Sequence, residues 1–320
     1  MTLTVSKISK RYGDKWALRD VGFDVVDGEI FGIFGDIGSG KSTLLRCIAG
    51  DEKISGGSIS LDGAEWSKQT KRGRDVQMAG VSDPTGIVSL LARRNTVASS
   101  GETRLSELRE ALQTDKKVLL LDDPLIAIKS REREAVVLDI RRFAEHGNIV
   151  LMASSTFEDI ATNCDRMAII VDGEIIQIDT PQNIYEHPTT VSSVIGRSNL
   201  IAARRLSSTT ADLPEFMSLS GGHRLFAQAT EKNRLGAINQ NVVLAIRPEQ
   251  VSISFGASFP EDNLLKAVVT GIRFHGETTL VELDASGLLL EARVFRVVGL
   301  AAGDECMVSL PPDRLQVLKN

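Results

Sequence analysis

Cysteine and aromatic residues are scarce in this chain of 320 residues, and long hydrophobic runs are absent. The three cysteines, Cys47, Cys164 and Cys306, are odd in number and not spaced as metal ligands, so we interpret them as reduced core residues. No stretch approaches the roughly 18 apolar residues that a membrane-spanning helix needs, and residues 1–12 lack the apolar core of a secretory signal. We therefore expect a soluble, intracellular protein.

An excess of basic residues is also missing. Lys and Arg total 37 against 42 Asp and Glu, which gives a formal net charge of −5, so no nucleic-acid partner is expected. Hydrophobic residues make up 42% and charged residues 25%, the composition of an ordinary globular protein. At about 100–200 residues per domain, the length predicts two domains.

The sequence pattern changes near residue 197. Before it, short β-branched runs alternate with helical segments, which is typical of a parallel α/β sheet. The runs are residues 29–34 (EIFGIF), 42–49 (STLLRCIA), 118–121 (VLLL), 131–144 and 149–152 (IVLM). After it, strand patterns alternate with turn residues, as at 242–246, 266–272 and 279–283. We predict an α/β domain over residues 1–197 and an all-β, OB-like domain over residues 198–320.

A phosphate-binding motif of the form G-x-x-x-x-G-K-[ST] lies between the first strand and the first helix. Its glycines let backbone N–H groups converge on phosphates, Lys41 reaches the β and γ phosphates, and the Ser42 hydroxyl ligates Mg²⁺. The predicted nucleotide-binding residues are Gly35, Asp36, Ile37, Gly38, Ser39, Gly40, Lys41, Ser42 and Thr43. The motif predicts a P-loop NTPase core that binds ATP with Mg²⁺; the alternative is a glycine-rich turn before a helix.

Two carboxylates follow the apolar strand at 118–121. Asp122 and Asp123 would emerge at the carboxyl edge of a parallel strand, where ligands of open α/β sheets bind. We predict that Asp122 holds Mg²⁺ together with Ser42, and that Asp123 lies near the attacking water. The alternative is a carboxylate pair that only caps or solvates the end of the strand.

With these features the chain resembles the ATP-binding subunit of an ABC transporter. More specifically, it resembles the carbohydrate or glycerol-phosphate importer type, which has a C-terminal regulatory (TOBE-like) domain. Residues 10–13 (KRYG) resemble the family's A-loop, so the resemblance implies that Tyr12 stacks on adenine. Residues 58–63, 165–177 and 180–188 resemble the antiparallel strands and exit helix of the family's RecA-like core, and residues 244–251 (LAIRPEQV) resemble its regulatory domain.

Other family motifs are altered. The Q-loop glutamine aligns with Ser82, and the signature LSGGQ aligns with residues 98–102, where only Ser99 and Gly101 match. The D-loop aspartate aligns with Lys129 and the switch histidine with Ser154, which we take as the catalytic counterpart beside Asp123. Together these departures indicate a degenerate member of the family.

The helical subdomain is also shortened. The segment at about 83–98 leaves room for at most one average helix of about 11–12 residues, where the family has several that receive the membrane subunit. The phrase LSGG at 219–222 lies between two strand-like runs, so we predict a hairpin turn. Arg247 and Glu249 flank Pro248, and we interpret them as a solvated turn.

The resemblance implies function and partners. We expect the ATP-binding subunit of an importer for a carbohydrate, polyol or related solute, at the cytoplasmic face of the membrane, with a second ATP-binding subunit, permease subunits and a solute-binding protein. Asp123 is one methylene shorter than the family's glutamate, so hydrolysis is expected to be weak or to need a partner subunit. The alternatives are a non-hydrolysing regulatory subunit of a heterodimer and an unrelated P-loop small-molecule kinase.

Overall fold

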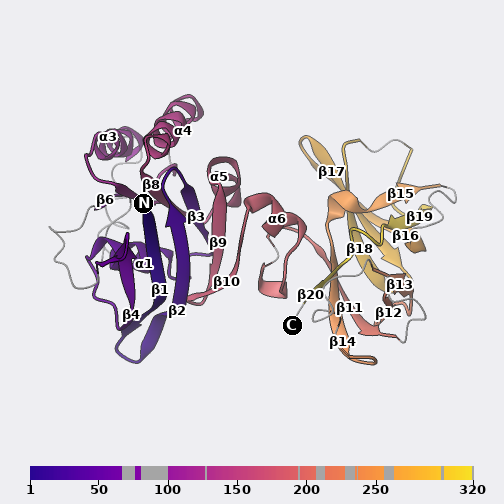
Figure 1. The fold of residues 1–320 in the computed structure, drawn as a ribbon. Coiled ribbons are helices and arrows are strands. Elements are labelled where there is room, and N and C mark those ends of the chain that lie inside the picture. Colours follow the sequence, from indigo (N-terminus) through magenta and orange to yellow (C-terminus); the bar gives the residue numbers. More distant parts are fainter. Residues whose placement is uncertain are drawn as a thin grey trace. The chain divides into compact units, whose positions relative to one another are not determined.

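Figure 1 shows the computed structural model, which describes residues 1–66, 76–80, 100–126, 128–193, 195–206, 213–227, 235, 237–255, 263–296 and 299–318. The chain divides into two compact units, Met1–Ile184 and Tyr185–Asn320. The boundary between the units precedes residue 197, because Arg247 of the C-terminal unit binds the segment that begins at Tyr185.

A six-stranded sheet carries the first unit. Its strand order is β10-β9-β3-β8-β7-β6, and every neighbouring pair is parallel except β10 with β9. All residues of β7 and β8 are buried, as expected for central strands covered on both faces. The strands are β3 (Ile30–Phe34), β6 (Val76–Gly80), β7 (Val118–Asp122), β8 (Ile149–Ser154), β9 (Arg166–Val171) and β10 (Glu174–Asp179).

An antiparallel sheet of order β2-β1-β4-β5 completes the core of this unit. Its strands are β1 (Thr2–Tyr12), β2 (Lys15–Val26), β4 (Gly56–Leu61) and β5 (Ala64–Glu65). Burial alternates along the second half of β2, as a sheet with one face on the core requires. Helix α1 (Lys41–Ala49) buries Leu44, Leu45 and Ile48 completely, in one hydrophobic cluster with residues of both sheets. This packing fixes the helix whose first residue is the P-loop lysine.

The remaining described helices of the first unit are α3 (Ser100–Leu112), α4 (Ser130–Glu145), α5 (Phe157–Asn163) and α6 (Pro181–Glu186), the last of which crosses into the second unit. Helix α4 buries Val136, Ile140 and Ala144 at the spacing of one helical face. The helices and strands predicted at 29–34, 42–49, 118–121, 131–144 and 149–152 are confirmed to within a few residues.

The second unit is built from strands, as predicted. One antiparallel sheet has the order β13-β12-β11-β14-β20 and the other the order β15-β19-β16-β17-β18. Both contribute to one hydrophobic core that includes Phe216, Leu244, Leu283 and Val308. The strands are β11 (Asn199–Arg205), β12 (Glu215–Ser218), β13 (Arg224–Phe226), β14 (Asn241–Ile246), β15 (Ser252–Ser254), β16 (Asn263–His275), β17 (Thr278–Ala285), β18 (Leu288–Val294), β19 (Glu305–Leu310) and β20 (Gln316–Leu318).

The LSGG phrase forms the turn between β12 and β13, and the hairpin prediction is confirmed. Gly221 and Gly222 have φ angles of 72° and 64°, a region that glycine enters without steric cost. The Ser218 hydroxyl accepts a hydrogen bond from the His223 N–H at 2.8 Å, which closes the turn.

The interpretation of Arg247 as part of a solvated turn is wrong. Its side chain is only 4% exposed, and burial lowers the pKa of the guanidinium. It donates hydrogen bonds to the carbonyl oxygens of Tyr185 (2.8 Å) and Ile195 and lies 4.0 Å from the centre of the Tyr185 ring. The Tyr185 hydroxyl in turn donates to Glu249 at 2.7 Å. We call these contacts of Arg247 with Tyr185 and Ile195 the Arg247 clasp. They explain why residues from Tyr185 onward belong to the second unit.

Candidate functional site

The P-loop connects β3 to α1 and depends on its glycines. A Cβ atom at Gly35 would lie 2.3 Å from the carbonyl oxygen of Ile170, and one at Gly40 would lie 2.8 Å from that of Ala17. Gly38 and Gly40 also have φ angles of 87° and 113°, which L side chains rarely adopt. The loop therefore needs glycine both for its curvature and for its close approach to neighbouring backbone.

Lys41 is the buried cation of this loop. Its side chain is 6% exposed, and Nζ donates hydrogen bonds to the carbonyl oxygens of Gly35 at 2.6 Å and Asp36 at 2.8 Å. Burial lowers the pKa of the ammonium, while the nearby carboxylates of Asp123, Asp122 and Asp36 oppose this shift. The lysine is thus held at the loop, close to the two carboxylates at the end of β7, Asp122 and Asp123.

Two buried oxygen atoms of the site have no hydrogen-bond partner in the described part of the chain: Ser39 Oγ and Asp122 Oδ1. Such atoms are rare in folded proteins, and both oxygens are able to bind a ligand group at this site. Asp122 is 2% exposed, and its pKa is raised mainly by this burial. The Ser42 hydroxyl lowers the pKa of Asp122 and the charge of Asp123 raises it further. The donor set of Ser39, Lys41, Ser42 and Asp122 therefore fits a phosphate and a divalent cation.

Binding of a divalent cation together with a phosphate does not need a complete set of protein ligands around the metal. No group of three or more His, Cys, Asp or Glu side chains that could hold a metal occurs among the residues that the structure describes. Mg²⁺ is usually held by one or two protein oxygens, substrate phosphates and water, which suits Ser42 and Asp122.

Asp123 is fixed against the end of β8. It has a φ of 47°, its N–H donates to the Ala153 carbonyl at 2.9 Å, and its Oδ1 accepts the Ser155 N–H at 3.2 Å. Ser155 was not predicted, since a backbone contact leaves no mark in the sequence.

Ser154 has a different environment. Its side chain is 1% exposed; Oγ donates to Asp159 Oδ2 at 3.4 Å and accepts the Thr156 N–H at 3.0 Å. These bonds hold the loop after β8. The part of Ser154 in the reaction stays a prediction.

Tyr12 ends β1 with its side chain 45% exposed. The Lys10 ammonium lies 4.6 Å from the ring centre and donates to Glu52 at 2.8 Å, and burial together with Glu52 raises the pKa of the Tyr12 hydroxyl. The ring is therefore supported from within the fold and open to solvent in part.

Several predicted positions are not tested by the structure. Ser82, Ser99 and the segment 83–98 lie outside the described residues. Gly101 lies in the first turn of α3, and Lys129 immediately precedes α4.

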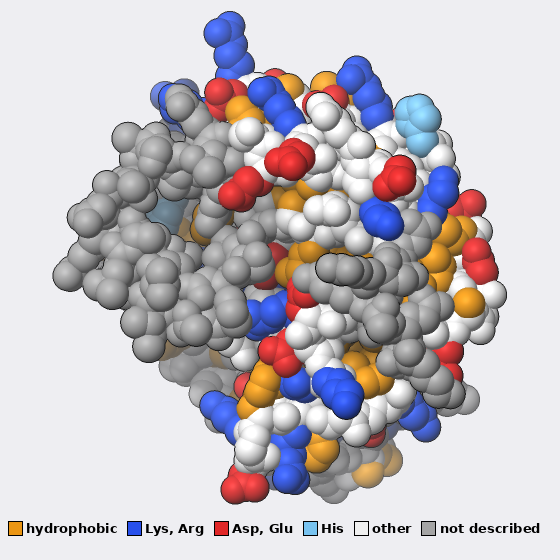
Figure 2. Space-filling model, turned by 90° about the vertical axis from the view of Figure 1, so that its left-hand side faces the viewer, with side chains coloured by type: hydrophobic (Ala, Val, Ile, Leu, Met, Phe, Trp, Pro, Cys, Tyr) orange, Lys and Arg blue, Asp and Glu red, His pale blue; other side chains and the backbone are white. Residues whose placement is uncertain are grey.

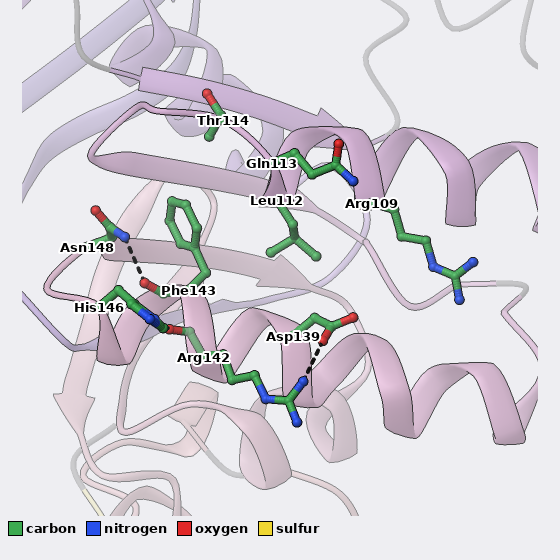
Figure 3. A pocket seen from close by; sticks show the side chains of 9 residues that line it. All are labelled: Arg109, Leu112, Gln113, Thr114, Asp139, Arg142, Phe143, His146 and Asn148. Atoms are coloured by element: carbon green, nitrogen blue, oxygen red, sulfur yellow. Dashed lines mark hydrogen bonds and ion pairs between the residues drawn. The ribbon is translucent and has the colours of Figure 1, made fainter.

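Two other hollows lie away from the P-loop. One of about 480 Å³ is lined by the ends of α3 and α4, with Arg109, Asp139, Phe143 and His146 around it (Figure 3). The other, of about 740 Å³, lies in the second unit and is lined by Phe255, Lys266, Asp284, Glu305 and other residues of the second sheet. On the face shown in Figure 2, acidic and basic side chains of the described residues are intermingled. None of the described P-loop residues lines either hollow.

Comparison with known proteins agrees with the geometry. Residues 18–91 match the ABC transporter family and residues 244–318 match the TOBE domain. The chain is 30% identical to the spermidine/putrescine import ATP-binding protein PotA of Pseudomonas fluorescens, over 81% of this chain and 80% of that protein. It is 24% identical to the xylose/arabinose import ATP-binding protein XacJ of Haloferax volcanii (98% and 93% covered), and 26% identical to the Fe(3+) ions import ATP-binding protein FbpC 2 of Haemophilus influenzae (96% and 95%).

A solved nucleotide-free ATP-binding cassette from an ABC transporter has the same fold, with a TM-score of 0.50 and 18% identity over 62% of this chain and all of that one. The fold and the site define a P-loop ATPase core followed by a TOBE-type β domain. The chain belongs to the family of ABC transporter ATP-binding proteins. The described residues include no helix long and apolar enough to cross a membrane.

Proposed function

We propose that the chain binds Mg-ATP at the P-loop as the energising subunit of an ABC importer. The observation that carries this proposal is the pair of unpartnered buried oxygens, Ser39 Oγ and Asp122 Oδ1, beside the buried ammonium of Lys41. In the proposed complex the loop amides and Lys41 bind the phosphates, and Ser42 and Asp122 hold Mg²⁺, which would neutralise phosphate charge. Tyr12 provides the surface on which the adenine stacks.

We further propose that Asp123 orients the attacking water, with Ser154 at the position of the family's histidine. The side chain of Asp123 is shorter than the family's glutamate, and Ser154 replaces the family's histidine. Both differences predict slow turnover, or turnover only with a second ATP-binding subunit. A non-hydrolysing regulatory subunit of a heterodimer is the alternative.

The transported solute is proposed at the level of class. The named relatives are import proteins for xylose/arabinose, spermidine/putrescine and Fe(3+) ions. Our first candidate is a carbohydrate or polyol, and our second is a polyamine. The importer role implies a location at the cytoplasmic face of the membrane, permease subunits and a solute-binding protein, with the TOBE domain as a regulatory module.

Purification of the tagged chain from its own cells tests this role. Co-purification of a membrane permease with Mg-ATP binding by the complex supports it. Binding of Mg-ATP without a permease, together with phosphorylation of a small molecule, would favour a P-loop kinase instead.

A further inference from the structure

One ion pair joins two helices behind the predicted catalytic carboxylate. Arg133 of α4 pairs with Asp159 of α5 through Nη2 and Oδ1. The Asp159 side chain is almost completely buried, and its second oxygen accepts the hydrogen bond from Ser154 Oγ at 3.4 Å. The carboxylate of Asp159 therefore connects α4 to the last residue of β8.

Ser154 passes this restraint to the loop that follows the strand. Its Oγ accepts the Thr156 N–H at 3.0 Å, so the backbone is fixed on both sides of Ser155. The Ser155 N–H, between these two fixed points, donates to Asp123 Oδ1 at 3.2 Å. The Asp123 N–H donates in turn to the Ala153 carbonyl at 2.9 Å, so both the main chain and the side chain of Asp123 are bound to the end of β8.

We infer that Arg133 and Asp159 are positioning residues for Asp123, acting through Ser154 and the Ser155 N–H. The inference rests on the proposed function, in which Asp123 orients the water. A hydrogen bond from a fixed N–H restricts the orientation of a carboxylate, and a displacement of about 1 Å can lower a reaction rate on the order of 10²-fold. The Ser155 N–H, which contacts the Asp123 carboxylate, follows directly after Ser154, the position that aligns with the family's histidine.

The first experiment compares Asp159→Asn and Arg133→Met with the unaltered full chain, together with the subunits that co-purify with it. We expect turnover to fall about tenfold and the Kd for Mg-ATP to change less than about twofold, because the P-loop is untouched. Asp159→Glu and Arg133→Lys should recover part of the rate. In an Asp123→Ala background, Asp159→Asn should have no further effect on residual turnover.

Arg141→Met is the matched control. Arg141 also extends from α4 and pairs with Asp165 at 2.9 Å. Within the described part of the chain its hydrogen bonds go to Asp165 and the Asn163 carbonyl, and not to residues 154–156. Its turnover should stay near that of the unaltered protein. A tenfold loss in this control would show that any break between α4 and its neighbours slows the reaction, and would overturn the inference.

A second measurement does not depend on hydrolysis. Hydrogen exchange at the Ser155 amide should accelerate at least about tenfold in Asp159→Asn and Arg133→Met but not in Arg141→Met. Unchanged exchange in the first two variants would overturn the inference even if turnover fell. If the unaltered complex binds Mg-ATP without phosphate release, both the proposed hydrolysis and the positioning role are contradicted. If the unaltered complex hydrolyses ATP but the two variants do not show the expected changes, only the positioning role is contradicted and the proposed function still holds.

Discussion

The hydroxyl of Ser42, in the first turn of α1, lies beside the buried carboxylate of Asp122 at the end of β7 and lowers the pKa of that carboxyl, against the effect of burial. The two residues are far apart in the sequence, and the parallel sheet brings the strand end to the helix that follows β3. Both are predicted ligands of Mg²⁺, so their contact is the structural basis of the proposed metal site.

Asp122→Asn is expected to separate stability from binding. Burial raises the pKa of Asp122 in the folded protein, so the charged form is disfavoured by folding and the penalty appears as the pH rises above the ordinary aspartate range. The neutral variant should therefore unfold at a temperature a few degrees higher near pH 7 without nucleotide, and the gain should vanish at low pH. The same variant should lose at least about tenfold in Mg-ATP affinity.

Thermal scans at several pH values, with and without Mg-ATP, measure both effects. Asp123→Asn is the control for charge alone, because Asp123 is only partly buried. A destabilised Asp122→Asn protein at neutral pH would contradict the assigned pKa direction.

Tyr12→Ala should lower ATP affinity about tenfold, since stacking on an aromatic ring is worth about 1–3 kcal/mol per base. Tyr12→Trp should preserve it. Inorganic triphosphate, which has no base, should bind all three proteins alike. Equal weakening of ATP and triphosphate would show that Tyr12 supports the loop rather than the base.

Gly40→Ala is predicted to destabilise the first unit by about 1–3 kcal/mol, because φ is 113° and the new Cβ would lie 2.8 Å from the Ala17 carbonyl. Gly147→Ala is the matched control: φ is 81°, but nothing lies within 4 Å of the added atom. Chemical denaturation should therefore show a smaller loss for Gly147→Ala. Equal losses would mean that the backbone angle alone explains the effect.

Arg247→Met removes the clasp of the second unit and leaves the Tyr185 and Ile195 carbonyls without their donor. We expect a loss of about 2–4 kcal/mol in the stability of that unit, with faster proteolysis near residue 185. Arg314→Met, at an exposed surface pair with Asp313, should cost less than about 1 kcal/mol. Similar proteolysis of both variants would contradict the clasp.

Sequence patterns predicted the elements that local chemistry determines. The positive φ angles of the P-loop glycines, the apolar strand before Asp122 and the Gly221–Gly222 turn each depend on residues close in the sequence, and the structure contains the predicted elements. The close approach of Gly35 to Ile170 and of Gly40 to Ala17 depends on the tertiary fold instead. The interpretation of Arg247 was wrong because its carbonyl partners, those of Ile195 and Tyr185, lie more than fifty residues earlier in the chain. No local sequence pattern reaches that far. The contact of the Ser155 N–H with Asp123 uses a backbone group, which every residue type except proline offers equally.

Equilibrium binding of Mg-ATP to the full chain and to Lys41→Ala tests the central claim most directly. We predict saturable binding of one nucleotide per chain that weakens at least about tenfold when Mg²⁺ is chelated, and that falls at least about a hundredfold in Lys41→Ala, while the Arg141→Met control binds normally. Binding that is absent in the unaltered chain, or that persists in Lys41→Ala with unchanged affinity, would contradict the account.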